Sequence, residues 1–347
     1  MSKLRWGICS AGRISQDFAT VLSQLENHEV GAVAARSEQD ARRLAERVGC
    51  ATAYEGYELL AADANIDIVY IGSIDTHHLP LCKLFLGAKK HVLCEKPLSL
   101  NTQEVQVILD CAKDSGCFFM EGIWSRFFPA YRKIKSLIDE GEIGDVQYIM
   151  GDFSQKVPDD FRVFVKSTGG SAINDIGVYL VQLAVMIFGP EPISVQGVGG
   201  LSATGVDDVC TWTMLYPGKK VASFTTCLRA MGQNEASIVG TEGRIRLPAS
   251  FHCPTAVELS KGSPAGGKCE KKVFEFPLPD TKGTFNYHNS AGFCYEAEAV
   301  KEAIDNGKTE HPIVPWSESL AIRKIMDKLH QDVGYVFTDE DAKAAGR

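Results

Sequence analysis

The first 120 or so residues alternate short apolar segments with amphipathic ones, and this alternation restricts the fold more than any other feature of the chain. The apolar segments have strand length and are apolar on both faces; they span residues 4–9, 30–35, 66–72 and 91–94. The segments between them repeat apolar residues at helical spacing, as in the stretch 14–25. Strands of this kind separated by amphipathic helices predict βαβ units and a parallel sheet.

Capping residues mark the ends of two of these helices. Ser37 is expected to cap a helix over residues 38–48 that ends at Gly49. Asn101 or Thr102 is expected to cap a helix over 103–115 that ends at Gly116. A further strand is expected at 118–121, after which the pattern changes near Trp124.

Beyond Trp124 the sequence predicts mainly strands. Alternating or β-branched runs separated by turn residues lie at 145–153, 193–198, 208–216, 220–227, 234–239, 243–247, 255–259 and 272–276. Helices are expected at 129–139, 174–188, 293–306 and 317–333, and a mobile hairpin loop at 261–268.

We therefore predict an α/β protein with two domains. Residues 1–124 would form a domain with a doubly wound parallel sheet. Residues 125–347 would form an α+β domain with a mostly antiparallel sheet. The terminal helices could pack back on the first domain.

Composition excludes several classes of protein. The net charge of −8 disfavours nucleic acid as a partner. No apolar run approaches the roughly 18 residues that span a bilayer, and the N-terminus has no apolar signal region, so we expect no membrane association. The 11 cysteines form no C-x-x-C pair and no zinc-like cluster. They predict reduced thiols in a cytoplasmic protein without a metal.

The turn after the first strand reads Ser10-Ala-Gly12-Arg13-Ile14-Ser15. The dinucleotide pattern G-x-G-x-x-G allows backbone to approach a pyrophosphate at a helix N-terminus. Only its middle glycine is present here, as Gly12, with serines at the first and third positions. We expect Ser10, Gly12, Arg13 and Ile14 to contact the cofactor, although an ordinary βα turn explains the same residues.

The second strand ends in Arg36-Ser37 rather than in an acidic residue. An acid at this place would bind the ribose hydroxyl of NAD. Arg36 and Ser37 could instead bind a 2′-phosphate, which favours NADP. An exposed arginine at a strand end is the alternative explanation.

The segment HVLCEKP places Glu95 and Lys96 at the end of a parallel strand, where a doubly wound sheet binds its ligands. Pro97 restricts Lys96 to extended backbone, and a cis bond between them would suit the turn. We expect both residues at the cofactor site.

Several segments occur together in an order and spacing that resembles one family. ICSAGRIS, VYIGSIDTHH, HVLCEKPL, GGSAINDIGVYLV and VGTEGRIRL are similar to the glucose–fructose oxidoreductase / inositol dehydrogenase family over about residues 4–334. The resemblance implies that residues 1–124 are an NADP-binding Rossmann domain and that residues 125–347 form a large open sheet for substrate binding and oligomerisation. The substrate would lie between the nicotinamide and that sheet. The resemblance assigns catalysis to Lys96, Asp175 and Tyr179. Further cofactor residues are Ser73, His78, Trp124 and Arg126, and further substrate residues are Trp124, Phe153 and Tyr287, although core packing would equally explain the aromatic ones.

The chemistry of the three catalytic candidates is coherent. Asp175 and Tyr179 are four residues apart and would share a helix face, with Gly169-Gly170 allowing close approach. A phenol has a reference pKa of about 10, and the Lys96 ammonium would favour its phenolate. Tyr179 would then take the hydroxyl proton while hydride goes to the nicotinamide. Asp175 would orient Lys96 or a substrate hydroxyl.

The expected function is NADP-dependent oxidation of a secondary or anomeric alcohol. The resemblance points to the branch that acts on trans-dihydrodiols of arenes and on aldoses such as D-xylose, and it also suggests a homodimer. Two alternatives stay open: another sugar or inositol dehydrogenase, and a non-catalytic NADP-binding regulator.

Tyr131 and Lys135 fit the Y-x-x-x-K pattern of short-chain dehydrogenases, but the glycine turn of that family is absent. The GVDD segment, 205–208, is interpreted as a turn and strand start rather than a metal site.

Overall fold

The computed structural model describes residues 3–262 and 269–346, and the chain divides into two compact units. The first unit contains Met1–Trp124 and Leu278–Ser319, and the second contains Ser125–Pro277 and Leu320–Arg347. The first segment of the first unit ends at Trp124. The units are not two continuous segments, however, because residues 278–319 return to the first unit. Most of the 261–268 loop lies outside the described residues.

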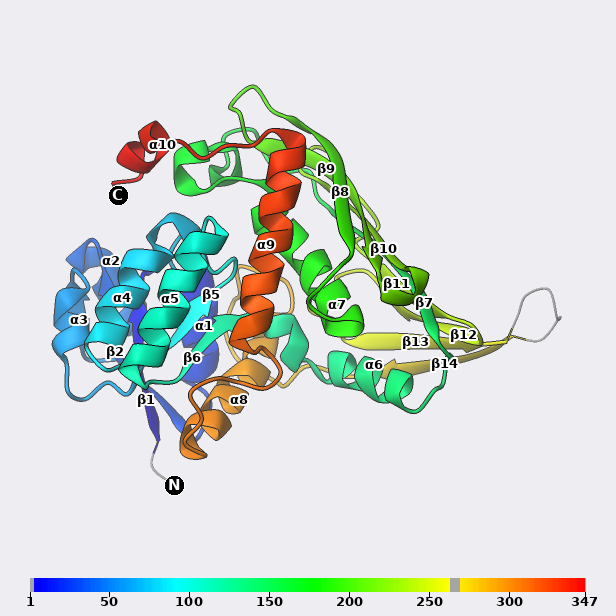
Figure 1. Ribbon diagram of the computed structural model, residues 1–347. Coiled ribbons are helices and arrows are strands. Elements are labelled where there is room, and N and C mark those ends of the chain that lie inside the picture. The colour runs from blue at the N-terminus through cyan, green and yellow to red at the C-terminus, as the bar shows by residue number, and fades with distance from the viewer. Residues whose placement is uncertain (1–2, 263–268, 347) are drawn as a thin grey trace. The chain divides into compact units, whose positions relative to one another are not determined.

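The first unit contains a six-stranded parallel sheet in the order β3-β2-β1-β4-β5-β6 (Figure 1). Its strands are β1 (Leu4–Cys9), β2 (His28–Ala35), β3 (Ala53–Glu55), β4 (Ile68–Ile71), β5 (His91–Glu95) and β6 (Phe119–Gly122). This doubly wound order confirms the predicted Rossmann sheet. The short strand β3 and the helix α3 (Glu58–Ala62) were not predicted, because three and five residues are too few to show a period.

Helices cover this sheet in two groups. Besides α3, they are α1 (Arg13–Leu22), α2 (Glu38–Val48), α4 (His78–Gly87), α5 (Thr102–Ser115) and α8 (Phe293–Asp305), with the one-turn helices η1 (Asp75–His77) and η8 (Ser290–Gly292). Helix α4 packs beside α5 and α3, whereas α1 packs beside α2 and α8. Ser37 caps α2 and Asn101 caps α5 through side-chain oxygens, as predicted.

The second unit contains an eight-stranded sheet in the order β14-β13-β12-β11-β7-β10-β9-β8. All neighbours are antiparallel except β7 and β10, which confirms a mostly antiparallel sheet. The strands are β7 (Val146–Ser154), β8 (Ser194–Leu201), β9 (Asp207–Tyr216), β10 (Lys220–Cys227), β11 (Ala236–Gly240), β12 (Gly243–Leu247), β13 (Ala256–Lys261) and β14 (Glu270–Glu275).

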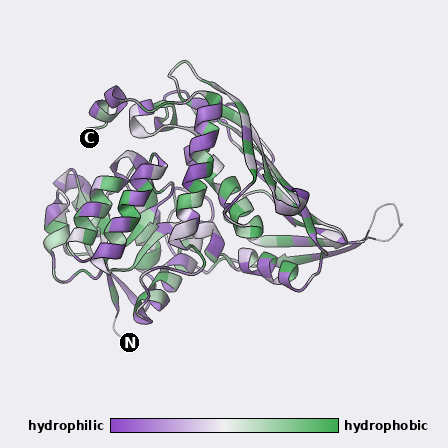
Figure 2. Cartoon of the chain, in the orientation of Figure 1, coloured by the Kyte–Doolittle hydropathy of each residue, from purple (hydrophilic) through white to green (hydrophobic). Residues whose placement is uncertain are grey.

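Helix α7 (Val178–Phe188) packs on one face of this sheet, against β7 and β10 (Figure 1). Figure 2 shows that it is hydrophobic over most of its length. The opposite face is open, since Tyr148, Met150 and Leu215 are exposed there. The remaining elements are α6 (Pro129–Asp139), α9 (Trp316–Val333) and α10 (Asp339–Ala344), with short turns η2 (Trp124–Phe127), η3 (Arg162–Phe164), η4 (Lys166–Thr168), η5 (Ile173–Gly177) and η6 (Pro217–Lys219).

The stretch Lys166–Phe188, which includes α7, is long and apolar enough to cross a membrane. The sequence had suggested no stretch of that length. Its most apolar window is 78% buried inside the structure. A buried core helix has the same composition as a membrane span, so the stretch gives only weak evidence of a membrane.

One buried carboxylate attaches the returning segment to the first unit. Asp17 on α1 is fully buried, and its oxygens accept hydrogen bonds from Asn286 N at 2.9 Å, Asn286 Nδ2 at 2.7 Å, Tyr287 N at 3.0 Å and Ser290 Oγ at 2.7 Å. Charge-assisted bonds to backbone N–H groups are among the stronger hydrogen bonds in proteins. Asp17 therefore fixes the chain path that leads into α8.

We expect the Asp17→Ala substitution to lower the free energy of unfolding by about 3–5 kcal/mol. It removes several hydrogen bonds to a charged group at once, from the part-buried N–H groups of Asn286 and Tyr287 and from the buried Ser290 hydroxyl. Urea unfolding followed by circular dichroism measures this loss. Asp114→Ala, at an exposed position near the end of α5, is the control and should stay within about 0.5 kcal/mol. Equal stabilities of the two variants would contradict the assignment.

Candidate active site

Most of the predicted cofactor residues follow the carboxyl ends of the parallel strands in the first unit. Ser10 to Ile14 follow β1, Arg36 and Ser37 follow β2, Ser73 and His78 follow β4, and Lys96 follows β5. The strand order changes direction between β1 and β4, which is where doubly wound sheets bind nucleotides. The fold therefore gathers these residues at one edge of one sheet.

The turn between β1 and α1 fits a pyrophosphate. Ser10 adopts a left-handed conformation with φ of 86°, and its Oγ accepts a hydrogen bond from Gly12 N at 3.3 Å. Gly12 is the N-cap residue of α1 and carries no side chain to cover the helix N-terminus. A Cβ at Gly12 would meet nothing closer than 3.5 Å, so space is left beside the exposed N–H groups.

The serine at the third glycine position of the pattern has a packing role that is normally given to glycine. Ser15 is buried, and its Oγ donates to the carbonyl of Gly72 at 3.4 Å. A Cβ at Gly72 would lie 2.2 Å from that Oγ and 2.8 Å from Tyr70. The close approach of helix and sheet is thus provided by a glycine after β4 instead of one on α1.

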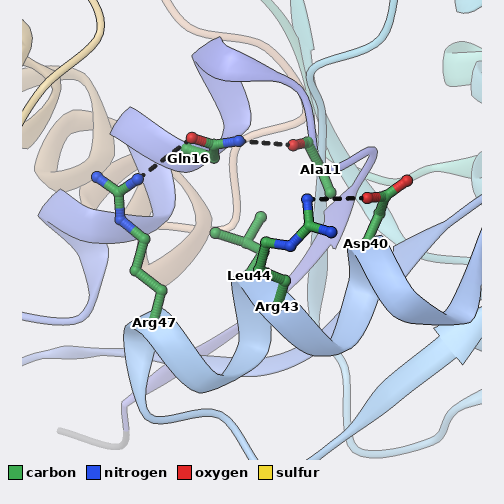
Figure 3. Close-up of a pocket in the computed structure, with 6 residues that line it drawn as sticks. All are labelled: Ala11, Gln16, Asp40, Arg43, Leu44 and Arg47. Atoms are coloured by element: carbon green, nitrogen blue, oxygen red, sulfur yellow. Dashed lines mark hydrogen bonds and ion pairs between the residues drawn. The ribbon is translucent and has the colours of Figure 1, made fainter.

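The end of β2 presents positive charge. Arg36 is exposed, and Ser37 Oγ accepts from Asp40 N at 3.3 Å. A small pocket beside the turn is lined by Ala11 and Gln16 and by the α2 residues Asp40, Arg43, Leu44 and Arg47 (Figure 3). Both guanidinium groups of this pocket already have partners: Arg43 pairs with Asp40 Oδ1 at 3.3 Å, and Arg47 donates to Gln16 Oε1 at 3.2 Å and to Thr284 O at 2.6 Å.

His78 has both ring nitrogens directed at backbone carbonyls. Nδ1 lies 3.0 Å from Pro97 O, and Nε2 lies 3.1 Å from Ser73 O. Burial lowers the pKa of His78 to about 4, and the surrounding carbonyl oxygens oppose this shift. His78 thus joins the loop after β4 to the loop after β5, and its contact with the cofactor stays a prediction.

The Glu95 side chain forms buried hydrogen bonds at the end of β5. The peptide bond between Lys96 and Pro97 is cis. Glu95 Oε1 accepts from the Tyr70 hydroxyl at 2.7 Å, and Oε2 accepts from Lys96 N at 3.2 Å. Burial raises the pKa of Glu95, while the Lys96 ammonium opposes the shift. Lys96 itself is half-buried at the strand end.

Near Glu95 lies a carboxyl group that the sequence did not single out. Glu296 on α8 is fully buried, and neither of its oxygens has a hydrogen-bond partner among the described residues. Burial, with a smaller contribution from the charge of Glu95, raises its pKa well above the usual range. Its neighbour on the same helix, Phe293, stacks on Trp124 with ring centroids 4.4 Å apart.

The predicted helix over 174–188 begins in the second unit with a π-helical turn, η5, that carries Asp175. The Arg162 guanidinium donates to Asp175 Oδ1 at 2.9 Å, a partner that was not predicted. A Cβ at Gly170 would lie 2.4 Å from Val163 O, so this glycine allows the preceding turn to approach. π-Helical turns are frequent at functional sites.

Asp207 fixes the start of this turn, because its Oδ2 accepts from Ile173 N at 2.9 Å. Burial raises the pKa of Asp207 to about 7. The GVDD segment is thus a turn at Gly205, with φ of 76°, followed by the first residue of β9. Among the residues that the structure describes, no group of three or more His, Cys, Asp or Glu side chains could hold a metal ion.

Tyr179 lies in a cluster of rings. Its ring centroid is 5.8 Å from that of Phe153 on β7 and 5.1 Å from that of His252, and Phe153 stacks on His252 at 4.5 Å. The predicted pair Tyr179 and Phe153 is therefore brought together. His252 was not predicted, because it is more than 70 residues from Tyr179 in the sequence and belongs to no local motif.

Two other predicted site residues, Arg126 and Tyr287, form hydrogen bonds with neighbouring parts of their own units. Arg126 is buried in the second unit, where Nε and Nη2 donate to Gln182 Oε1 and Gln182 O, each at 2.9 Å. These bonds attach Arg126 to α7. A contact between Arg126 and the cofactor stays a prediction. Tyr287 lies in the first unit with 40% of its surface exposed, and Asp17 holds its backbone. Tyr131 of the Y-x-x-x-K pattern is buried and bonded to Gln182.

Two family models match the chain. Residues 4–123 match "Oxidoreductase family, NAD-binding Rossmann fold", and residues 131–246 match "GFO/IDH/MocA C-terminal domain". Among curated proteins, the chain is 41% identical over 340 residues to trans-1,2-dihydrobenzene-1,2-diol dehydrogenase of Danio rerio, covering 97% of this chain and 99% of that protein. The protein of the same name from Homo sapiens is 38% identical over 342 residues, with the same two coverages.

Solved structures share the fold at lower identity. KijD10, a 3-ketoreductase from Actinomadura kijaniata in complex with NADP, has a TM-score of 0.84 at 23% identity and covers 96% of this chain and 98% of its own. A levoglucosan dehydrogenase in complex with NADH and levoglucosan has the same TM-score at 20% identity, with the same coverages. These likenesses confirm the fold. The two family models and the diol dehydrogenase relatives confirm the family resemblance.

The buried carboxyl of Glu296 makes stability depend on pH. Its folded-state pKa is raised above the unfolded value of about 4.3, so the native state keeps a proton that the unfolded chain releases as pH rises. Replacing Glu296 by Met should increase the unfolding free energy above that pH, with a gain that grows by about 1.4 kcal/mol per pH unit until the folded-state pKa is reached.

Urea unfolding of wild type and Glu296→Met at pH 5, 6 and 7 measures this slope. Glu302→Gln, on an exposed part of the same helix, is the control without a buried carboxyl. A Met variant whose gain is the same at all three pH values would show that Glu296 does not retain its proton in the folded state.

Proposed function

Because the chain belongs to the GFO/IDH/MocA family of oxidoreductases, we propose that it oxidises a secondary or anomeric alcohol with NADP. The proposed substrates are trans-dihydrodiols of arenes, aldoses such as D-xylose, or both. The observation that carries the proposal is Tyr179 in its cluster of rings beside the π-helical turn, together with Lys96 at the carboxyl edge of a Rossmann sheet. The diol dehydrogenases that match over nearly the full length support the substrate class.

The cofactor preference is argued from charge. No acidic residue ends β2, and the exposed Arg36 and the Ser37 hydroxyl are suitable donors for a 2′-phosphate. The turn from Ser10 to Ile14 would hold the pyrophosphate against the N-terminus of α1. A bound nicotinamide would supply the acceptor for the hydrogen and electron pair of the substrate C–H bond.

The protein residues would handle the proton. Tyr179 would accept the proton of the substrate hydroxyl, and the positive charge of Lys96 would favour the phenolate form that this needs. The Glu95 carboxyl, which accepts a hydrogen bond from the Tyr70 hydroxyl, provides a polar group next to Lys96. Asp175, paired with Arg162, would position a substrate hydroxyl.

Two other functions make different predictions. Another sugar or inositol dehydrogenase would turn over neither D-xylose nor an arene dihydrodiol but would act on a different polyol. A non-catalytic NADP-binding regulator would bind the cofactor and turn over nothing. The presence of both Lys96 and Tyr179 favours an enzyme, because a regulator requires neither group.

We also propose that the protein is a cytoplasmic homodimer. The exposed Tyr148, Met150 and Leu215 on the open face of the second sheet support association with a second copy. The 11 cysteines, all within the described ranges, are free thiols, which supports a reducing compartment. Sedimentation equilibrium measures the oligomeric state.

The Tyr179→Phe substitution should reduce kcat by about 10²–10⁴-fold, because it removes the group that takes the proton. Lys96→Met should also reduce kcat strongly. The assay is NADPH formation from NADP with D-xylose and with trans-1,2-dihydrobenzene-1,2-diol. Tyr131→Phe is the matched control, and it should retain turnover. Loss of activity in that control with full activity in Tyr179→Phe would assign the chemistry to the Y-x-x-x-K pattern.

The Arg36→Ala substitution should weaken NADP binding by about tenfold to a hundredfold and leave NAD binding unchanged, since it removes charge-assisted bonds to the 2′-phosphate alone. Fluorescence titration with each reduced cofactor gives both dissociation constants. Lys113→Ala, at the end of α5, is the charge-matched control. Parallel weakening of both cofactors would show that Arg36 does not read the 2′-phosphate.

A further inference from the structure

A short turn after β12 places His252 beside Tyr179. Phe251 and Cys253 on either side are fully buried, while His252 is half-buried. Ser250 has a left-handed φ of 70°, and its carbonyl accepts from Cys253 N at 2.8 Å. The turn is therefore a fixed structure whose two neighbouring side chains anchor it in the core.

Further bonds hold the backbone of this turn. Ser125 Oγ donates to His252 O, and Phe251 N donates to Asn234 O at 3.3 Å. Asn234 is itself attached to β7, because its Oδ1 accepts from Ser154 N at 2.7 Å. The strand that carries Phe153 and the turn that carries His252 are thus connected by hydrogen bonds next to the rings.

The ring geometry fixes the plane in which the imidazole nitrogens of His252 lie. His252 stacks on Phe153 with an interplanar angle of 23°, and its plane is tilted by 51° to that of Tyr179. Because the nitrogens lie in the ring plane, they are directed sideways from the Phe153 face rather than into it. A phenylalanine at this place would give the same stack without any polar atom.

We propose that His252 is a specificity-determining residue that hydrogen-bonds a hydroxyl of a polyhydroxylated substrate and so favours an aldose over an arene dihydrodiol. The inference rests on the proposed function, in which Tyr179 marks the reacting hydroxyl. An aldose carries hydroxyls on the carbons next to the reacting one and on those beyond, whereas an arene dihydrodiol carries two on an otherwise apolar ring. A site built to bond a substrate hydroxyl discriminates strongly against a compound that lacks it.

The test compares His252→Phe, which keeps the stacked ring, with His252→Gln, which keeps hydrogen-bonding capacity. We expect the ratio of kcat/KM for D-xylose to kcat/KM for trans-1,2-dihydrobenzene-1,2-diol to fall about tenfold or more in His252→Phe and to recover partly in His252→Gln. His288→Phe, at an exposed position in the first unit, is the matched control. An unchanged ratio, or an equal loss with both substrates, overturns the proposal.

A binding measurement separates this proposal from the proposed function. Equilibrium dialysis of labelled D-xylose with the NADPH-loaded protein needs no turnover. Binding that is weakened about tenfold in His252→Phe supports the role of His252 even if the wild type oxidises neither substrate, in which case the proposed function alone fails. Equal binding by wild type and His252→Phe, or no binding by the wild type, overturns it.

Discussion

The first sheet is buried on both faces, and much of the structure follows from how the chain satisfies this requirement. Strand β4 has every residue buried, so helices must cover it on both sides. Part of the cover comes from α8, whose buried residues include Phe293 and Val300. The backbone N–H groups of Asn286 and Tyr287, just before α8, donate to the Asp17 carboxylate. This segment can therefore pack against α1 with these N–H groups paired.

The elements that could be predicted are those with a strong local signal. The helix over 38–48 has a serine before it and a glycine after it, and the structure reproduces both ends. Strand β10 alternates buried and more exposed residues from Val221 to Cys227, and its bounds are also reproduced. Period and capping are local properties, so a single sequence contains them.

The features that were missed depend on contacts between distant residues. Nothing near Arg126 indicates that Gln182 will accept both of its bonds, and nothing near His78 indicates that two carbonyls will surround its ring. The same holds for His252 beside Tyr179 and for Arg162 beside Asp175. For the candidate site, residue types could thus be predicted, whereas partners required the fold. The π-helical turn has no distinct sequence period and was predicted as α-helix.

The division of the chain has a consequence for how the protein is made. Each unit takes its residues from two separate stretches, and the first unit closes only with Leu278–Ser319. Strand β7 pairs with β10 and β11, which are synthesised some 70 to 90 residues later. A nascent chain that ends before these partners emerge would expose apolar strands and an unpaired central edge on the ribosome. Both units therefore depend on nearly complete synthesis, and a truncated product would be a substrate for chaperones and proteases rather than a smaller folded protein.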